Sequence, residues 1–403
     1  MSEDNPWQGW YQDGRQSPDV PPGSAASDAQ GDRTASYPMP GYSPSGGAGG
    51  RPWPAQPPPS GIPGRAAPGL GAPRSGRRWR FWGQRGRRGR RIALVIGVAV
   101  VVIIVALAST YFWIDGKLNK SVALPAFAGT SAGTNWLITG SDSRQGLSRS
   151  QIDALHVGFD FGTLNSDSIM LLHMGSGKPV LVSIPRDSYV PIPGHGMNKI
   201  NAALAFGGPS LLIQTVENVT GLRIDHYMGI GFGGLVSVVN TVGGVRVCVP
   251  AAIPKDSFSG FSLSKGCHNL NGTQALAFVR DRHSFATSDL QRIQDQRAFL
   301  KALLAKGTSP GVYLNPFSSF PFASTAASSI SVDKGTSLYD LIQAAFALRS
   351  PQTGTVPIAN AAFFTSNAGE AVQWNQAQAL ELFNALQKDK PVPAGLLTGT
   401  QVG

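Results

Sequence analysis

The sequence is poor in the residues that build metal sites and disulfide frameworks. It contains only two cysteines, and its six histidines show no spacing typical of metal ligands. It also contains no Gly-rich loop ending in Lys-Ser or Lys-Thr, the pattern that cradles nucleotide phosphates. A structural zinc site and a nucleotide-hydrolysing activity are therefore not expected.

Residues 1–91 have few aliphatic side chains. They are rich in Gly, Pro, Ser and Gln, with runs such as 52–54 and 57–59. Ordering such a segment would cost more conformational entropy than its burial could return. We predict a disordered tail.

Residues 92–114 lack charge entirely. A helix of this length spans roughly 34 Å, enough to cross a hydrocarbon core about 30 Å thick. A signal peptide fits poorly, because the apolar run is long and begins far from the N-terminus. The arginines that precede the run place residues 1–91 in the cytoplasm by the positive-inside rule, with the rest of the chain outside. These arginines are Arg74, Arg77, Arg78, Arg80, Arg85, Arg87, Arg88, Arg90 and Arg91.

The net charge of +11 is concentrated beside the membrane. Residues 1–91 hold 13 basic and 6 acidic side chains, a net of +7, which leaves 21 basic and 17 acidic side chains, a net of +4, for the remainder. Such a block suits a topology signal and contact with anionic lipids. We therefore expect a single-pass protein of the cell membrane and no nucleic-acid partner.

The two cysteines, Cys248 and Cys267, both fall in the part expected outside the cytoplasm. In an oxidising compartment two such residues are expected to pair. The bridge would stabilise the fold by about 3 kcal/mol on the chain-entropy estimate. We predict a structural disulfide.

The outer part reads as a stalk over residues 115–134, one domain over residues 135–390 and a flexible C-terminus over residues 391–403. Within the domain, short apolar runs alternate with amphipathic segments, a pattern typical of an α/β fold layered around a central sheet. Strands are predicted at 135–139, 168–174, 180–184, 225–231, 245–249 and 355–358. Helices are predicted at 199–206, 210–219, 232–241, 271–278, 288–306, 338–348 and 374–387.

Polar residues interrupt the apolar face of the helix predicted at 288–306. Phe299, Leu300 and Leu303 define a stripe facing the core, and the same stripe continues backwards to three polar residues, Gln296, Arg292 and Asp289. Buried charges are costly unless they are paired or used. The sequence leaves two interpretations open, a functional site and an ion pair with the segment around Arg280.

Further charges lie at strand ends. If 168–174 and 180–184 form a hairpin, Asp167 and Arg186 share one edge of the sheet. Asp142 ends another strand, and strand ends are where α/β folds place ligands. Arg280 and Arg282 are two residues apart, so an extended segment would point both to one side.

These residue types suit a pyrophosphate. The planar fork of arginine matches phosphate oxygens, whereas carboxylates can hold Mg²⁺, which bridges to phosphate. Such a set favours phosphoryl transfer, in which positioning and charge neutralisation provide most of the catalysis.

Six ordered segments resemble the LytR-CpsA-Psr family. They are 140–144 (GSDSR), 183–187 (SIPRD), 198–203 (NKINAA), 221–227 (GLRIDHY), 278–283 (FVRDRH) and 289–294 (DLQRIQ). The resemblance covers residues 135–306. It implies a three-layer α/β/α fold with a central mixed sheet, and a phosphotransferase that moves a glycopolymer from a polyprenyl-pyrophosphate carrier onto peptidoglycan with Mg²⁺ as cofactor.

The resemblance also implies roles for individual residues. Asp142 and Asp167 would hold the metal, and the pyrophosphate clamp would comprise Arg186, Lys199, Arg280 and Arg282. Asp289, Arg292 and Gln296 would complete the site, with Asp289 as the base for the acceptor hydroxyl. The lipid tail would lie in a hydrophobic pocket.

One position departs from the family pattern. The family usually has an arginine two residues before its second aspartate, whereas this chain has Asn165 before Asp167. Either one phosphate ligand is missing or another residue, such as Arg144, replaces it. Two other functions therefore stand beside transfer to peptidoglycan: hydrolysis of the lipid pyrophosphate, and a non-enzymatic role as a cell-envelope sensor or transcriptional attenuator.

Overall fold

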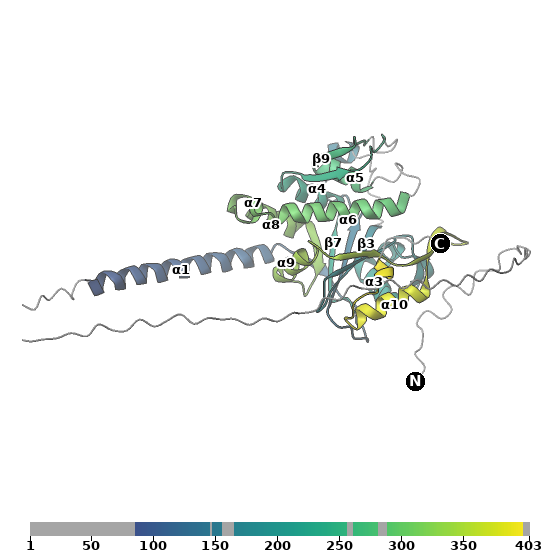
Figure 1. The fold of residues 1–403 in the computed structure, drawn as a ribbon, viewed down its shortest axis with the longest axis horizontal. Coiled ribbons are helices and arrows are strands. Elements are labelled where there is room, and N and C mark those ends of the chain that lie inside the picture. Colours follow the sequence, from purple (N-terminus) through teal and green to yellow (C-terminus); the bar gives the residue numbers. More distant parts are fainter. Residues whose placement is uncertain (1–84, 146, 155–164, 256–260, 281–287, 398–403) are drawn as a thin grey trace, which may run out of the picture. The chain divides into compact units, whose positions relative to one another are not determined.

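The computed structural model describes residues 85–145, 147–154, 165–255, 261–280 and 288–397 (Figure 1). Its first element is helix α1, Arg85–Asp115, whose apolar portion Gly89–Asp115 is long enough to cross a membrane. The helix begins at Arg85, seven residues before the span predicted at 92–114. The predicted disordered tail lies outside the described residues up to residue 84.

The centre of the domain is a seven-stranded mixed sheet with strand order β1-β10-β7-β2-β3-β4-β11. Its strands are β1 Asn119–Val122, β2 Thr134–Ser141, β3 Ser166–Met174, β4 Val180–Ile184, β7 His226–Ile230, β10 Ile330–Asp333 and β11 Gln352–Thr355. β3 pairs antiparallel with β2 and β4, whereas β7 runs parallel to β2 and β11 runs parallel to β4. The hairpin predicted at 168–174 and 180–184 is confirmed.

Alternate side chains of the central strands pack into two cores on opposite faces. Leu137 and Leu171 face one core, which contains helices α3, Ala202–Thr220, and α10, Gln376–Gln387. Trp136 and Leu172, one position away, face the other core, beneath α6, Ser288–Gly307, and α9, Leu338–Ala347. Figure 1 shows α3 and α10 across the sheet from α6. The predicted three-layer α/β/α architecture is confirmed, because strands buried on both faces need a helical layer on each side.

A second lobe packs against the outer face of α6. It consists of α4 Phe232–Thr241, β8 Val245–Val249, β9 Gly266–Leu270 and α5 Gly272–Arg280, and its core includes Phe299 and Leu303 of α6. β8 pairs with β9 in a separate hairpin, so it does not extend the central sheet. The predicted disulfide is present in this hairpin, where Cys248 and Cys267 lie directly opposite one another.

The remaining elements border these two cores. The helices are α2 Arg149–Ala154, α7 Pro310–Tyr313, α8 Pro316–Ser329 and α11 Ala394–Leu397. Two further antiparallel pairs form from β5 Tyr189–Ile192 with β6 Gly196–Lys199, and from β12 Ile358–Thr365 with β13 Gly369–Trp374. The break predicted between the helices at 199–206 and 210–219 is present inside α3, at Gly207 and Gly208.

The segments at both ends of the predicted domain contribute elements to the fold. The segment predicted as a stalk contributes β1 to the sheet, where Val122 is buried in the core. The segment predicted as a flexible C-terminus contributes α11, whose Leu396 is also buried. In both segments a few apolar side chains among small polar ones are enough to anchor the chain. Residues 398–403 lie outside the described part.

Candidate pyrophosphate and lipid site

The hairpin of β3 and β4 brings Asp167 and Arg186 together. Because Ile169 faces Ile184 across the hairpin, Asp167 and Arg186 each lie two positions beyond this pair, at one end of the hairpin. Arg186 Nη1 lies 3.1 Å from Asp167 Oδ1, as the sequence predicted.

Asp187 extends this pair into a chain of alternating charges. Its Oδ2 lies 3.2 Å from Arg186 Nε and its Oδ1 lies 3.3 Å from Lys199 Nζ. Lys199 is the last residue of β6, which returns beside Asp187 as part of the β5–β6 hairpin. Asp187 had no predicted role, although it lies within one of the segments that match the family. These ion pairs hold the cationic side chains of Arg186 and Lys199 at fixed positions beside the cavity.

Asp142 lies immediately after β2, on the same side as Asp167. Its Oδ1 accepts the backbone N–H of Asn165 at 2.8 Å, and its Oδ2 lies 3.4 Å from the Asn165 side-chain amide nitrogen. Both aspartates and Arg144 line the cavity described below. Position 165 therefore holds Asp142 mainly through its backbone N–H, and Arg144 adds a cation to the same wall.

Arg280 also lines the cavity but reaches it differently from the prediction. It is the last residue of α5 and does not belong to an extended segment, because the helix continues past the predicted end at Phe278. Its guanidinium carbon lies 4.9 Å from the centre of the Phe232 ring, a cation–π arrangement that sequence analysis did not identify. Arg282 lies outside the described residues, so its role stays a prediction.

Helix α6 confirms the apolar stripe of the sequence analysis. Phe299 and Leu303 are buried, and with Leu300 they line the cavity. The side chains of Asp289, Arg292 and Gln296, in the first half of the helix, lie outside the described part. Their predicted roles stay predictions.

Arg297 is a functional candidate that sequence analysis missed. It donates to Ser183 Oγ at 2.9 Å, to Thr355 Oγ1 at 2.8 Å and to the carbonyl oxygen of Gly354. Burial lowers the pKa of the Arg297 guanidinium to about 10. Three neutral acceptors on β4 and β11 thus fix the middle of α6 over the sheet. The sequence does not predict these hydrogen bonds, because Arg297 simply follows three other polar residues in a polar stretch.

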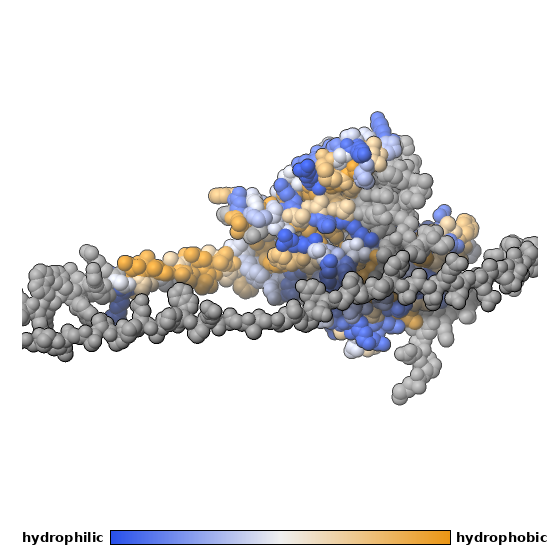
Figure 2. All heavy atoms as spheres, viewed as in Figure 1, coloured by the Kyte–Doolittle hydropathy of each residue, from blue (hydrophilic) through white to orange (hydrophobic). Residues whose placement is uncertain are grey.

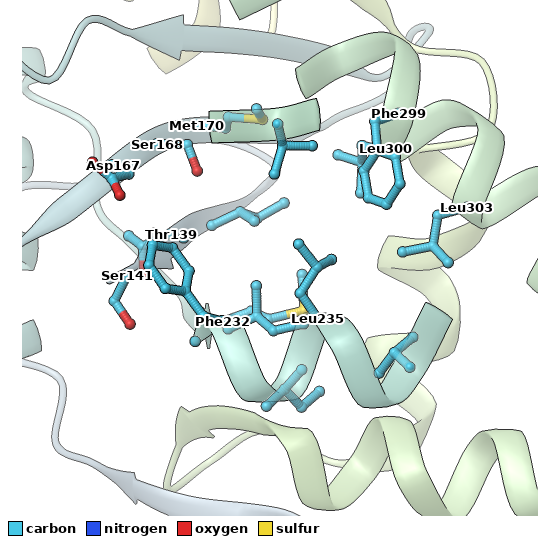
Figure 3. Close-up of a pocket in the computed structure, with 18 of the residues that line it drawn as sticks. Thr139, Ser141, Asp167, Ser168, Met170, Phe232, Leu235, Phe299, Leu300 and Leu303 are labelled. Atoms are coloured by element: carbon cyan, nitrogen blue, oxygen red, sulfur yellow. The ribbon is translucent and has the colours of Figure 1, made fainter. Parts of the chain in front are cut away.

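The charged side chains described above, apart from Arg297, line one end of a cavity of about 900 Å³. Figure 3 shows Ser141, Asp167 and Ser168 at one end of the cavity, and Phe299, Leu300 and Leu303 at the other. Beyond them the lining consists of aliphatic and aromatic side chains from α4, α8 and α9, including Leu235, Phe322 and Leu341. The arrangement suits a ligand with an anionic head and a long apolar tail.

The polar end of the cavity has too few carboxylates to bind a metal ion without additional oxygen ligands from the substrate. Of the described lining residues, four are cationic (Arg144, Arg186, Lys199 and Arg280) and three are carboxylates (Asp142, Asp167 and Asp187), a net charge of +1. The described residues form no cluster of three or more His, Cys, Asp or Glu side chains able to hold a metal. Mg²⁺ commonly uses one or two carboxylates together with phosphate oxygens, and Asp142 retains unused lone pairs for that role.

The fold and this cavity define an α/β protein whose cavity suits an anionic head group joined to a lipid-like chain. The LytR_cpsA_psr family model matches residues 102–388, and the chain belongs to this family. The resemblance seen in the sequence is thereby confirmed.

Named relatives work in the bacterial cell wall. The probable cell wall biosynthesis protein LcpB of Corynebacterium glutamicum is 48% identical over 278 residues, which cover 68% of this chain and 66% of that protein. The Bacillus subtilis polyisoprenyl-teichoic acid–peptidoglycan teichoic acid transferase TagT is 42% identical over 134 residues, 32% of this chain and 41% of that protein. The matched residues thus span less than two thirds of each relative, 66% of LcpB and 41% of TagT.

Solved structures share the fold. The structure of TagT bound to LI-WTA has a TM-score of 0.50 and 27% identity, and covers 66% of this chain and 98% of its own. The LytR-Csp2A-Psr enzyme from Actinomyces oris has a TM-score of 0.52 at 22% identity, covering 67% of this chain and 96% of its own, which supports the fold alone.

Proposed function

We propose that this protein is a phosphotransferase that moves a glycopolymer from a polyprenyl-pyrophosphate carrier onto peptidoglycan. The observation that carries the proposal is the continuity of the cavity, whose cationic end opens directly into an apolar end. A pyrophosphate would lie among Arg186, Lys199 and Arg280, and its prenyl chain would lie along α6. Helix α1 would hold the protein in the cell membrane with the domain outside, where this substrate is found.

The reaction exchanges one bond at phosphorus for another. An acceptor hydroxyl oxygen of peptidoglycan attacks the phosphorus that carries the glycan. The bond from that phosphorus to the bridging oxygen breaks, and polyprenyl phosphate leaves. The hydroxyl proton passes to a base, the role predicted for Asp289. Arg186 and Arg280 hold the phosphoryl oxygens in place and offset the charge that develops on them.

The proposal includes Mg²⁺ as a cofactor whose ligands would come from both the protein and the substrate. Each phosphoryl group of the carrier is anionic, so the net charge of +1 at the polar end falls short of neutralising it. Bound between Asp142, Asp167 and the phosphoryl oxygens, the ion would supply the remaining positive charge. Omission of Mg²⁺ should therefore weaken binding of the pyrophosphate lipid, and not only turnover.

The test is incubation of the purified full-length protein with lipid-linked glycan, with and without peptidoglycan. Polyprenyl phosphate release that requires peptidoglycan, with glycan covalently attached to it, supports the transferase. Release at the same rate without an acceptor indicates a hydrolase. If Arg280→Ala and Asp142→Ala are silent in cells while deletion of residues 1–73 abolishes function, the protein is a sensor.

A further inference from the structure

Helices α7 and α8 expose apolar side chains that the cavity does not use. The sequence contains no charged residue from Pro310 to Val332, a stretch that includes both helices. Within it, Leu314, Phe317 and Phe320 are exposed, Phe317 to 88%. Figure 2 shows hydrophobic surface at the tip where α7 and α8 lie. An exposed apolar group of this kind marks an interaction site.

Helix α9 adds a second exposed apolar stripe. Tyr339, Ile342 and Phe346 are exposed and follow the spacing of one helical face. Ser337 and Asp340 form a capping box that begins the helix, so the polar residues at this end serve the helix terminus. We call six side chains the α8–α9 surface: Leu314, which follows α7, Phe317 and Phe320 of α8, and Tyr339, Ile342 and Phe346 of α9.

The same two helices also form walls of the cavity. Phe322 and Ala326 of α8, and Leu338 and Leu341 of α9, line its apolar end. The α8–α9 surface and the lipid cavity are thus separated by the thickness of these helices, and Ile342 belongs to both.

The α8–α9 surface is continuous with the end of α1. The Trp113 ring stacks on Phe320 with centroids 4.9 Å apart and an interplanar angle of 17°. Ile114 and Leu118 pack in one cluster with residues of α8 and α9. Asp115 Oδ1 accepts the backbone N–H of Leu338 at 2.7 Å. The last turn of the apolar helix is therefore attached to both helices, and Figure 1 shows α7, α8 and α9 grouped where the chain leaves α1.

Cationic side chains border these aromatic residues. Lys117 Nζ lies 4.3 Å from the centre of the Trp113 ring, and Arg349 Cζ lies 5.8 Å from the centre of the Phe346 ring. Aromatic rings flanked by lysine and arginine are typical of the membrane interface, where the rings enter the apolar boundary and the cations meet anionic head groups.

We infer that the α8–α9 surface inserts into the leaflet that contains the C-terminal end of α1. The prenyl chain of the substrate then passes from the leaflet to the cavity alongside α8 and α9, without crossing water. The inference rests on the proposed function in two respects, that α1 crosses a bilayer and that the substrate carries a prenyl chain. Continuity with α1 and the cationic border favour lipid over a protein partner, because a protein partner requires neither.

Site-specific labelling tests the insertion directly. Both native cysteines are bonded to each other, so an introduced cysteine is the only free thiol. Full-length Phe317→Cys and Phe346→Cys are labelled with a polarity-sensitive fluorophore and reconstituted into vesicles containing phosphatidylglycerol and nitroxide-labelled lipid. The matched control is Phe364→Cys, since Phe364 in β12 is exposed to 80% but lies outside the surface. Val102→Cys in the middle of α1 reports on the anchor.

Quenching at positions 317, 346 and 102, with none at 364, supports the inference. Quenching at 102 alone overturns the α8–α9 surface as a membrane contact and leaves the anchor standing. Absence of quenching at 102 contradicts the anchor itself. Equal quenching at 317 and 364 overturns specific insertion. Blue-shifted emission at 317 that nitroxide lipid does not quench indicates a protein partner, and this result also overturns insertion into the leaflet.

Turnover provides a second measurement. Phe317→Ser should lower turnover of bilayer-embedded substrate by about tenfold, the factor expected when one aromatic side chain's burial is lost. Turnover of a short-chain substrate in detergent should not change, and Phe364→Ser should affect neither. Equal loss in both assays would overturn a role in delivery of the lipid from the leaflet.

Discussion

The backbone N–H of Asn165 donates to Asp142 Oδ1 at 2.8 Å, and this bond joins the end of β2 to the start of β3. The family pattern expects an arginine at position 165, so the asparagine changes the polar wall of the cavity without breaking this connection. The bond uses the main chain, which any residue except proline provides. The side-chain amide, 3.4 Å from Asp142 Oδ2, adds little.

Asn165→Arg should therefore fold normally and bind the pyrophosphate lipid more tightly. A charge-assisted hydrogen bond contributes about 1.5–3 kcal/mol, and ordering the long side chain costs up to about 2 kcal/mol. A severalfold to tenfold decrease in Kd is expected, measured by calorimetry with polyprenyl pyrophosphate. Asn165→Gln, which adds length without charge, should leave Kd unchanged. Weaker binding by Asn165→Arg would show that position 165 does not face the ligand.

Arg186 should be essential for turnover and not replaceable by lysine. Its fork contacts Asp167 and Asp187 at once, which a single ammonium cannot do. Arg186→Ala also leaves both carboxylates facing an anionic substrate. By analogy with removal of one preorganised donor, kcat/KM should fall on the order of 100-fold or more, with little recovery in Arg186→Lys.

Arg223 provides the matched control for Arg186. It also pairs with an aspartate, Asp225, at 3.4 Å, but its side chain is 59% exposed and does not line the cavity. Arg223→Ala should leave kcat/KM within about twofold of the native value, since exposed ion pairs contribute little. A comparable loss in both variants would mean that the Arg186 effect reflects general disruption.

The central sheet and the polar wall at its edge could be predicted from the sequence because both depend on local pattern. Apolar runs of the right length gave the β3–β4 hairpin, and hairpin geometry then placed Asp167 beside Arg186. The α6 stripe of Phe299 and Leu303 followed from helical periodicity in the same way. Each of these relationships involves residues whose spacing is set by a single element or turn.

Relationships between distant elements could not be predicted. Arg297 bonds to β11, nearly sixty positions later, and hydrogen bonds of this kind leave no periodic trace. The extended geometry expected at Arg280 was wrong because α5 continues to that residue, and tertiary context overrides local propensity. The pairing of β1 with β10 joins strands more than two hundred residues apart, and a four-residue strand is too short to show alternation.

Arg297 should position α6, and with it the predicted base. Arg297→Met removes three hydrogen bonds to neutral acceptors, each worth about 1 kcal/mol net, so the free energy of unfolding should fall by about 2–3 kcal/mol. The corresponding decrease in Tm is about 5–10 °C. Lys301→Met, at an exposed position of the same helix, should not change Tm.

Measurements of kcat and KM for Arg297→Met show whether Arg297 positions α6 for catalysis or only stabilises the fold. At a temperature where Arg297→Met is fully folded, kcat should still fall, because α6, which carries the predicted base, is no longer fixed to β4 and β11. KM for the lipid should change less, since Phe299 and Leu303 still line the cavity. Native kcat in the folded variant would limit Arg297 to a structural role.

Glu217 should make the stability of the domain depend on pH. Its carboxyl group is only 2% exposed and accepts the backbone N–H of Ile224 at 2.9 Å. Burial raises the pKa of Glu217 from 4.5 to about 7, and the Ile224 hydrogen bond and the Arg223 charge offset only part of this effect. The folded state therefore binds the proton more tightly than the unfolded state.

It follows that the native protein loses stability as the pH rises from about 4.5 to 7, because folding then requires burial of a charge. Glu217→Gln keeps the shape and an acceptor oxygen for Ile224 but cannot ionise. The variant should match the native protein at acidic pH and exceed its unfolding free energy above pH 7 by on the order of 2–3 kcal/mol. Thermal melts at pH 4.5 and pH 8 measure this difference, with Glu381→Gln, at an exposed position of α10, as the control. Since a neutral amide removes the cost of the buried charge, a lower Tm for Glu217→Gln at pH 8 would mean that the ionised carboxylate is the better partner for the Ile224 N–H.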